Sequence, residues 1–205
     1  MIRHSIFVAW LLLLSACGMT DDPREEQKRM SYPEIPDPAF SAYLLETYDL
    51  NRDGRFSYYE AERILTINCP GRDIASLTGI EHFIQLRELN CADNRIESLD
   101  LSQNLDLEVV NCSRNTLYEL KFGHLRELRE VRCAENNLAD LDLISTPALH
   151  TIDCSVNELT LLDISHCART MKWVDARFNP LEIIYKSRNQ TIDYLQPGSG
   201  EVVEQ

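Results

Sequence analysis

A cluster of oxygen-bearing side chains between residues 49 and 60 has the clearest chemistry in this sequence. The side chains are those of Asp49, Asn51, Asp53, Ser57 and Glu60. Ca²⁺ takes about six to eight oxygen ligands, and carboxylates two residues apart converge on the ion when the chain turns sharply between them. Gly54 allows such a turn because it has no Cβ atom. The spacing therefore predicts a site for one calcium ion.

The same segment, DLNRDGRFSYYE, resembles the calcium-binding loop of EF-hand proteins. The resemblance implies a ligand set of Asp49, Asn51, Asp53, Arg55 through its backbone carbonyl, Ser57 and Glu60. A helix capping box is the simpler interpretation, and it accounts for Ser57 and Glu60 but not for the three residues before Gly54. Only one such loop is present, so we expect a structural clamp in the cap and not a paired calcium sensor.

Five cysteines recur after this loop at intervals of 22, 21, 21 and 21 residues: Cys69, Cys91, Cys112, Cys133 and Cys154. A parallel column of asparagines follows them: Asn94, Asn115, Asn136, Asn157 and Asn179. A fixed period of this length predicts a solenoid, in which each repeat packs on its neighbours. The asparagine amides are expected to turn inward and satisfy backbone groups at the bends.

The spacing also bears on whether the cysteines form disulfides. In-register strands would direct neighbouring thiols in parallel, which suits the ~90° disulfide torsion poorly. We therefore expect a column of free, buried thiols, with three disulfides as the alternative. Cys167 lies outside the column and is either the most exposed thiol or another packed residue.

The repeated pattern L-x-x-L-x-C-x-x-N-x-L, as in residues 86–96, resembles the leucine-rich repeat, with Cys in a core Leu position. The resemblance covers residues 64–185, about six units. It implies an α/β leucine-rich repeat solenoid of parallel strands, period 21–22, with a short helical EF-hand-like amino-terminal cap. The joint between cap and repeats, residues 74–83, is similar to that of secreted leucine-rich repeat proteins of Bacteroidota.

The amino terminus has the features of an export signal. Arg3 precedes nine apolar residues, 6–14, a run too short to span a bilayer, which needs ~20. The following Leu14-Ser15-Ala16-Cys17 resembles the lipobox of bacterial lipoproteins, which implies cleavage before Cys17 and a lipid on its thiol. An ordinary secretory signal is the alternative. The resemblance predicts an outer-membrane lipoprotein that faces the periplasm or the cell surface.

These features divide the chain into five predicted parts. They are a signal peptide (1–16), a flexible tether (17–36), a helical cap with the calcium loop (37–63), the repeats (64–185) and a carboxyl-terminal cap and tail (186–205).

The chain has 20 Lys and Arg against 33 Asp and Glu, a net charge of −13. This acidity argues against a nucleic-acid partner, because phosphate contacts need clustered basic residues.

Ligand recognition is predicted on the outward-facing strand residues, the concave face of the solenoid. Charge and one aromatic gather there at the carboxyl-terminal end, in Glu130, Arg132, Asp153, Trp173, Asp175 and Arg177. Trp and Arg are enriched at binding hot spots. The alternative for Trp173 is that it only shields the last repeat.

Taken together, the sequence predicts a membrane-anchored binding module for a protein or glycan ligand, with one structural calcium ion, and not an enzyme. Repeats of 21 or 22 residues leave no room for an active-site insertion, and no nucleophile has a neighbouring base. Two alternatives stay open at this point. One is a hydrolase that uses Asp153 and Asp175 as paired carboxylates, and the other is a self-associating envelope protein.

Overall fold

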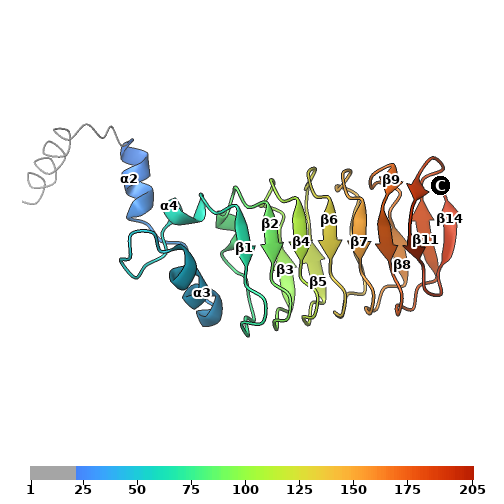
Figure 1. Ribbon diagram of the computed structural model, residues 1–205, viewed down its shortest axis with the longest axis horizontal. Helices are drawn as coiled ribbons and strands as arrows, with labels where there is room; N and C mark the ends of the chain where they lie inside the picture. Colours follow the sequence, from blue (N-terminus) through green and yellow to red (C-terminus); the bar gives the residue numbers. More distant parts are fainter. Residues whose placement is uncertain (1–21) are drawn as a thin grey trace, which may run out of the picture.

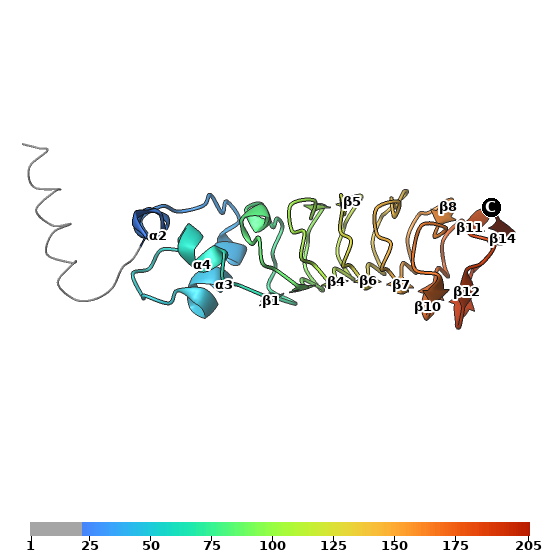
Figure 2. The ribbon, with the colours of Figure 1, turned by 90° about the horizontal axis from the view of Figure 1, so that it is seen from above.

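The computed structural model describes residues 22–205; residues 1–21, with the predicted signal peptide and Cys17, lie outside this part. Three helices come first: α2 (Pro23–Arg29), α3 (Pro38–Tyr48) and α4 (Tyr58–Ala61). A row of short strands then stacks along the long axis of the molecule, and the carboxyl terminus lies at the end opposite the helices (Figure 1). A view turned by 90° shows that the stack is close to straight (Figure 2).

One face of the solenoid is a seven-stranded parallel sheet in the order β1-β2-β4-β6-β7-β10-β13. Its strands are β1 (Thr66–Asn68), β2 (Glu88–Asn90), β4 (Val109–Asn111), β6 (Glu130–Arg132), β7 (Thr151–Asp153), β10 (Trp173–Asp175) and β13 (Leu195–Gln196). Each turn of the chain adds one strand to this sheet. The parallel leucine-rich repeat solenoid predicted from the sequence is therefore confirmed.

The remaining strands form small sheets elsewhere around the turns. They are β3 (Ser98–Asp100) with β5 (Glu119–Lys121), β9 (Thr170–Met171) with β12 (Thr191–Ile192), and β8 (Leu161–Asp163) with β11 (Ile183–Lys186) and β14 (Glu201–Glu204). A 3₁₀ helix, η2 (Ile80–His82), lies in the first repeat. All of these strand pairs are parallel, as expected when successive turns stack without reversing.

The core is built from columns of identical side-chain type. The middle residue of each long-sheet strand faces inward, because side chains alternate along a strand, and the cysteine two residues later does the same. Leu89 is 1% exposed and Val110, Cys91 and Cys112 are fully buried. The five cysteines of the column are buried and free, as the spacing predicts.

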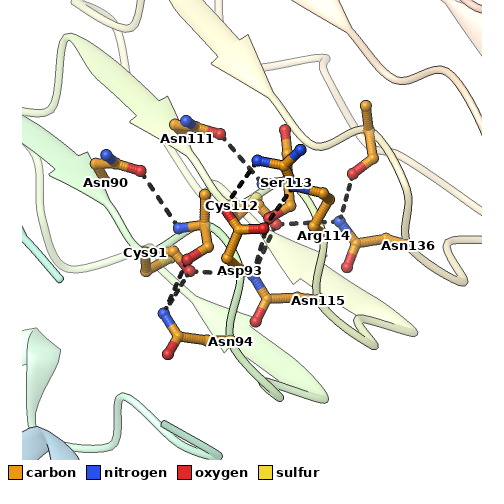
Figure 3. Close-up of polar contacts among 12 residues, drawn as sticks. Asn90, Cys91, Asp93, Asn94, Asn111, Cys112, Ser113, Arg114, Asn115 and Asn136 are labelled. Carbon is orange, nitrogen blue, oxygen red and sulfur yellow. Dashed lines mark hydrogen bonds and ion pairs between the residues drawn. The ribbon is translucent and has the colours of Figure 1, made fainter. Parts of the chain in front are cut away.

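The asparagine column holds consecutive turns together, as expected (Figure 3). Asn115 is typical: its Nδ2 donates to the carbonyls of Cys91 (3.1 Å) and Cys112 (3.0 Å), and its Oδ1 accepts from the amide of Ile96 (3.0 Å). One buried amide thus satisfies backbone groups of two turns that would otherwise lack partners.

A left-handed residue precedes each asparagine of the column. Its φ is 59° at Asp93, 55° at Arg114 and 55° at Val156, and glycines take the equivalent place at 71 and 198. The chain needs this conformation to leave the strand sharply enough for the asparagine to point inward. Glycine adopts it without strain, whereas a β-branched residue such as Val156 does not.

Asp37 links the cap to the first repeat. Asp37 Oδ1 accepts from the amides of Ala39 and Phe40 at the start of α3, and Oδ2 accepts from the amides of Ala75 and Ser76. Burial raises the pKa of Asp37, but these four bonds outweigh it and leave the pKa below its usual range. Asp37 is thus the N-cap of α3, which begins at Pro38.

Two stretches differ from the predicted organisation. Within the predicted tether, α2 packs on α4: Lys28 Nζ lies 2.6 Å from Glu62 Oε2, and the Tyr58 amide donates to the Ser31 carbonyl. Beyond residue 185, β13 and β14 continue the parallel pairing to Glu204, where a frayed tail is predicted. Both differences come from contacts between segments, which local composition does not reveal.

Candidate functional site

The outward side of the seven-stranded sheet, called the strand face below, carries two continuous columns of side chains. Strand register places Glu88, Val109, Glu130, Thr151 and Trp173 side by side in the first column. It places Asn68, Asn90, Asn111, Arg132, Asp153, Asp175 and Gln196 in the second. Five of the six predicted contact residues stand in these two columns: Glu130, Arg132, Asp153, Trp173 and Asp175.

At the carboxyl-terminal half, the strand face is hollowed. Arg132, Thr151, Asp153 and Trp173 line the hollow, and three of these four belong to the predicted patch. Thr151 has a small side chain between larger neighbours, so it forms the floor. Its hydroxyl contacts His150 Nδ1 at 3.0 Å.

Trp173 stacks on Tyr194, a residue outside the predicted patch. Its ring stacks on that of Tyr194, with ring centres 3.8 Å apart and planes 16° from parallel, and both side chains are 38% exposed. Tyr194 fell within the predicted carboxyl-terminal cap. A signal was nevertheless present, because Tyr194 follows Trp173 by 21 residues, the period of the repeat.

The polar residues of the hollow differ in how far they are engaged. Arg132 pairs with Glu130 at 2.5 Å. Asp153 Oδ1 accepts from the Ser155 amide (3.1 Å) and hydroxyl (2.7 Å), and within residues 22–205 its Oδ2 accepts no hydrogen bond. The Asp153 Oδ2 oxygen is therefore available to a ligand, and Arg132 can offer a ligand only the N–H groups that its pair with Glu130 leaves over.

Asp175 does not present its carboxylate as predicted. The residue is only 3% exposed, and Arg177 binds both oxygens through Nε (3.0 Å to Oδ1) and Nη2 (2.6 Å to Oδ2). Burial raises the pKa of Asp175. The side-chain and backbone hydrogen bonds from Arg177 lower it by more, so the pKa of Asp175 lies below its usual value. The seventh strand, β13, flanks β10, and the register pairs Asp175 with Gln196. Asp175 therefore positions Arg177, and it does not form an accessible carboxylate pair with Asp153.

The predicted calcium loop connects α3 to α4 and has two kinds of residue. Ser57 and Glu60 form the capping box: Glu60 Oε2 accepts from the Ser57 amide and hydroxyl, both at 2.8 Å, and Oε1 accepts from the Leu50 amide at 2.8 Å. The other residues form successive turns, with Asp49 Oδ2 accepting from Gly54 (2.9 Å). Asn51 Oδ1 accepts from the Asp53 amide, and Asp53 Oδ1 accepts from the Arg55 amide.

One atom of this loop lacks a partner. Asp49 Oδ1 is buried and makes no hydrogen bond, and a buried carboxylate oxygen without one is energetically unfavourable. Oxygens of this kind are the donors that Ca²⁺ takes, so the chemistry of the residues fits the ion. In the part of the chain that the structure describes, no three His, Cys, Asp or Glu side chains are gathered as a metal-holding group. Closure of the loop around an ion would require Asp53 and Glu60 to exchange their present partners.

The cysteines do not offer a reactive thiol among the described residues. Burial raises the pKa of Cys69, Cys112 and Cys154 to about 12, and it raises those of Cys91 and Cys133 as well. Cys167 is 8% exposed, and burial raises its pKa to about 12. Of the two alternatives left open for Cys167, the structure supports the packed residue, because the side chain lies in the core with its Sγ 4.0 Å from the Thr146 hydroxyl.

Comparison with known proteins agrees with this architecture. No family model matches the chain. Residues of the functional domain of InlJ from Listeria monocytogenes, described as including a cysteine ladder, superpose on 82% of this chain with a TM-score of 0.63 and 23% identity. The chain therefore has the leucine-rich repeat fold. An internalin from the same organism, inlF, also superposes on 82% of this chain, with a TM-score of 0.63 and 17% identity.

A sequence match points in the same direction. The leucine-rich repeat chain is 32% identical to internalin J of Listeria monocytogenes serotype 4b over 70 residues, which is 34% of the chain and 8% of internalin J. It covers 47% of the InlJ structure and 55% of the inlF structure. The chain therefore spans about half the length of these structures or less. Within residues 22–205, no helix is long and apolar enough to cross a membrane.

Proposed function

We propose that this protein is an exported, membrane-anchored recognition module that binds a protein or glycan ligand at the carboxyl-terminal half of its strand face. The observation that carries the proposal is the stacked, part-exposed Trp173–Tyr194 pair beside the hollow of Arg132 and Asp153. Trp, Tyr and Arg in such a setting are typical of binding hot spots. The fold shared with internalins is compatible with this role.

The anchor would be a lipid on Cys17, which the sequence predicts. Cys17 precedes α2, and the helical cap lies at the end of the solenoid opposite the carboxyl terminus (Figure 1). An anchor there would direct the Trp173 end of the strand face away from the membrane. This arrangement suits recognition of a ligand that approaches from outside an outer membrane.

A calcium ion would serve the cap and not the ligand site. The residues that would hold it are those of the predicted set, with Asp49 first because its Oδ1 lacks a partner. The ion would supply positive charge among the carboxylates of the loop and keep α3 and α4 together. The cap covers the first repeat, whose apolar face needs protection from water.

The hydrolase alternative loses its proposed carboxylate pair, because Arg177 occupies both oxygens of Asp175. The described cysteines are buried and their pKa values are raised, so none is a ready nucleophile. A recognition role makes better use of the exposed residues.

Partner capture tests the proposal. The full chain is used as bait in envelope and host-surface extracts, with and without Ca²⁺. We expect Trp173→Ala combined with Arg177→Ala to abolish capture, and Asn68→Ala combined with Asn90→Ala, at the other end of the strand face, to preserve it. Equal capture by both double variants would reject the proposed surface.

A further inference from the structure

The hollow beside Trp173 has one open aromatic face. Tyr194 covers the ring on the side of β13, at 3.8 Å between ring centres. On the opposite side, strand register places Thr151 of β7 next to Trp173. Because Thr151 is small and lines the same hollow, the second face of the indole is uncovered there.

The space over Thr151 has the width of one ring. Arg132 of β6 and Trp173 of β10 stand on either side of β7, so two strand spacings of ~4.8 Å separate their backbones. A flat group lying over Thr151 would contact the indole on one side and the Arg132 side chain on the other. Pre-stacking on Tyr194 fixes the indole plane before a ligand arrives, which reduces the entropy lost on binding.

Both signs of charge surround this space. Arg132 contributes the positive charge and is paired with the Glu130 carboxylate, Asp153 contributes a further negative charge, and Thr151 is neutral. An anionic ligand would meet Asp153, and a cationic ligand would meet Arg132. A neutral group with adjacent hydroxyls suits both, since one hydroxyl donates to Asp153 Oδ2 while its neighbour accepts from the guanidinium.

We infer that the hollow binds a neutral pyranose ring of a glycan, stacked by its C–H face on Trp173 and hydrogen-bonded to Asp153 and Arg132. This inference rests on the proposed function and names the ligand class of the same surface. The rest of a longer glycan would extend along the strand face.

Trp173 provides its own readout. The sequence has two tryptophans, and the other, Trp10, lies in the predicted signal peptide. The full chain with Trp10→Phe is titrated with the methyl pyranosides of glucose, galactose, mannose and N-acetylglucosamine while indole emission is followed. Glucuronate serves as the anionic probe and acetyl-arginine amide as the cationic one. We expect at least one neutral pyranoside to change the emission saturably, and both charged probes to have no saturable effect.

Two variants locate the binding. Thr151→Tyr fills the floor of the hollow, and Val109→Tyr is its matched control, since strand pairing places Val109 in the same column two turns away. We expect the first to weaken sugar binding at least tenfold and the second to leave it unchanged. Asp153→Asn replaces the free acceptor with a donor. It is expected to weaken binding several-fold without disturbing the fold, because asparagine already occupies this column at Asn90 and Asn111.

Several outcomes would overturn the inference. They are no saturable response to any neutral pyranoside up to its solubility limit, a response unaffected by Asp153→Asn, or a response to acetyl-arginine amide alone. A partner whose capture depends on Trp173 but survives enzymatic removal of its glycans would also overturn it, while leaving the proposed function intact. Capture that does not depend on Trp173 would overturn both.

Discussion

The two halves of the strand face share one backbone and carry different surfaces. In the amino-terminal half, the second column is made of Asn68, Asn90 and Asn111, and the Asn90 side chain donates to that of Asn68 at 2.8 Å. In the carboxyl-terminal half, the same column continues with Arg132 and Asp153. The strand register is unbroken between them, so the fold does not require the change.

The left-handed turn positions show the same division. Asp93 and Arg114 are joined by an ion pair of 2.6 Å, whereas Val156 and Phe178 are apolar and 43% and 74% exposed. All four have positive φ. An exposed apolar side chain in this conformation adds nothing to stability, and Glu135, between the two pairs, keeps a charged side chain at this position. Positions that differ between the two halves are not required by the fold, so they are free to serve recognition.

The largest expected effect tests whether the halves share one scaffold. Asn115→Ala and Asn157→Ala should each lower the free energy of unfolding by about 3 kcal/mol or more, because each removes partners from buried carbonyl and amide groups. Urea denaturation measures the change, and Asn111→Ala, on the outward side, should cost less than about 1 kcal/mol. Costs at 115 and 157 that differ by more than about 1.5 kcal/mol would contradict a uniform scaffold.

The second effect separates the cap from the repeats. Ca²⁺ at a hundred times its dissociation constant should stabilise the protein by about 2.7 kcal/mol, and Asp49→Ala should abolish this gain. Thermal melts with Ca²⁺ and with a chelator provide the measurement. Glu97→Ala is the matched control, because it removes a carboxylate from the repeats and not from the cap. This variant should retain the gain in stability. Melts that do not respond to Ca²⁺ would remove the calcium clamp.

A third effect concerns the pair of buried Asp175 and half-exposed Arg177 in the carboxyl-terminal half. Asp175→Asn should cost about 2 kcal/mol, because it removes the charge that holds Arg177. The pKa of Asp175 is lower in the folded state than in the unfolded state. Its contribution is therefore complete above the ordinary aspartate pKa of 3.8 and is lost as the pH falls through the lower, folded value.

Unfolding measured between about pH 2 and pH 5 checks this sign. The wild type should lose more stability than Asp175→Asn over that range. Parallel pH profiles for the two proteins would show that the pair contributes nothing.

The smallest effect is a gain in stability. Val156→Gly should raise the free energy of unfolding by a few tenths to about 1 kcal/mol, since glycine relieves the left-handed strain of a β-branched residue. Arg114→Gly, at the equivalent position of the other half, should gain less because it also loses the ion pair with Asp93. Denaturation midpoints compare the two. A larger gain in stability from Arg114→Gly than from Val156→Gly would contradict the proposed difference between the two halves.

Much of this structure was predictable because the period repeats the same physical requirement. The spacing of cysteines and asparagines predicted parallel strands, inward thiols and inward amides, and the register and hydrogen bonds confirm them. The extent of the solenoid was harder to predict. The last turn has no cysteine and no asparagine of the column, so Tyr194 and β13 carried only the weaker signal of spacing.

The candidate site divides in the same way. The strand alternation placed Arg132, Asp153 and Trp173 on one surface from the sequence alone. It also placed Asp175 there, and the structure shows instead that this side chain is buried under Arg177. Exposure within an outward column depends on which neighbours fold over it, and alternation does not contain that information.

The sequence by itself determined the repeating architecture, because a period of 21 or 22 residues with a fixed apolar pattern has one economical way to bury its side chains. It also determined the capping box and the chemical nature of the loop from Asp49 to Glu60. Which outward residues are exposed, stacked or paired follows from packing between turns. The stacking of Tyr194 on Trp173, the pairing of Asp175 with Arg177 and the unpartnered oxygen of Asp49 all depend on three-dimensional contacts that no local pattern specifies.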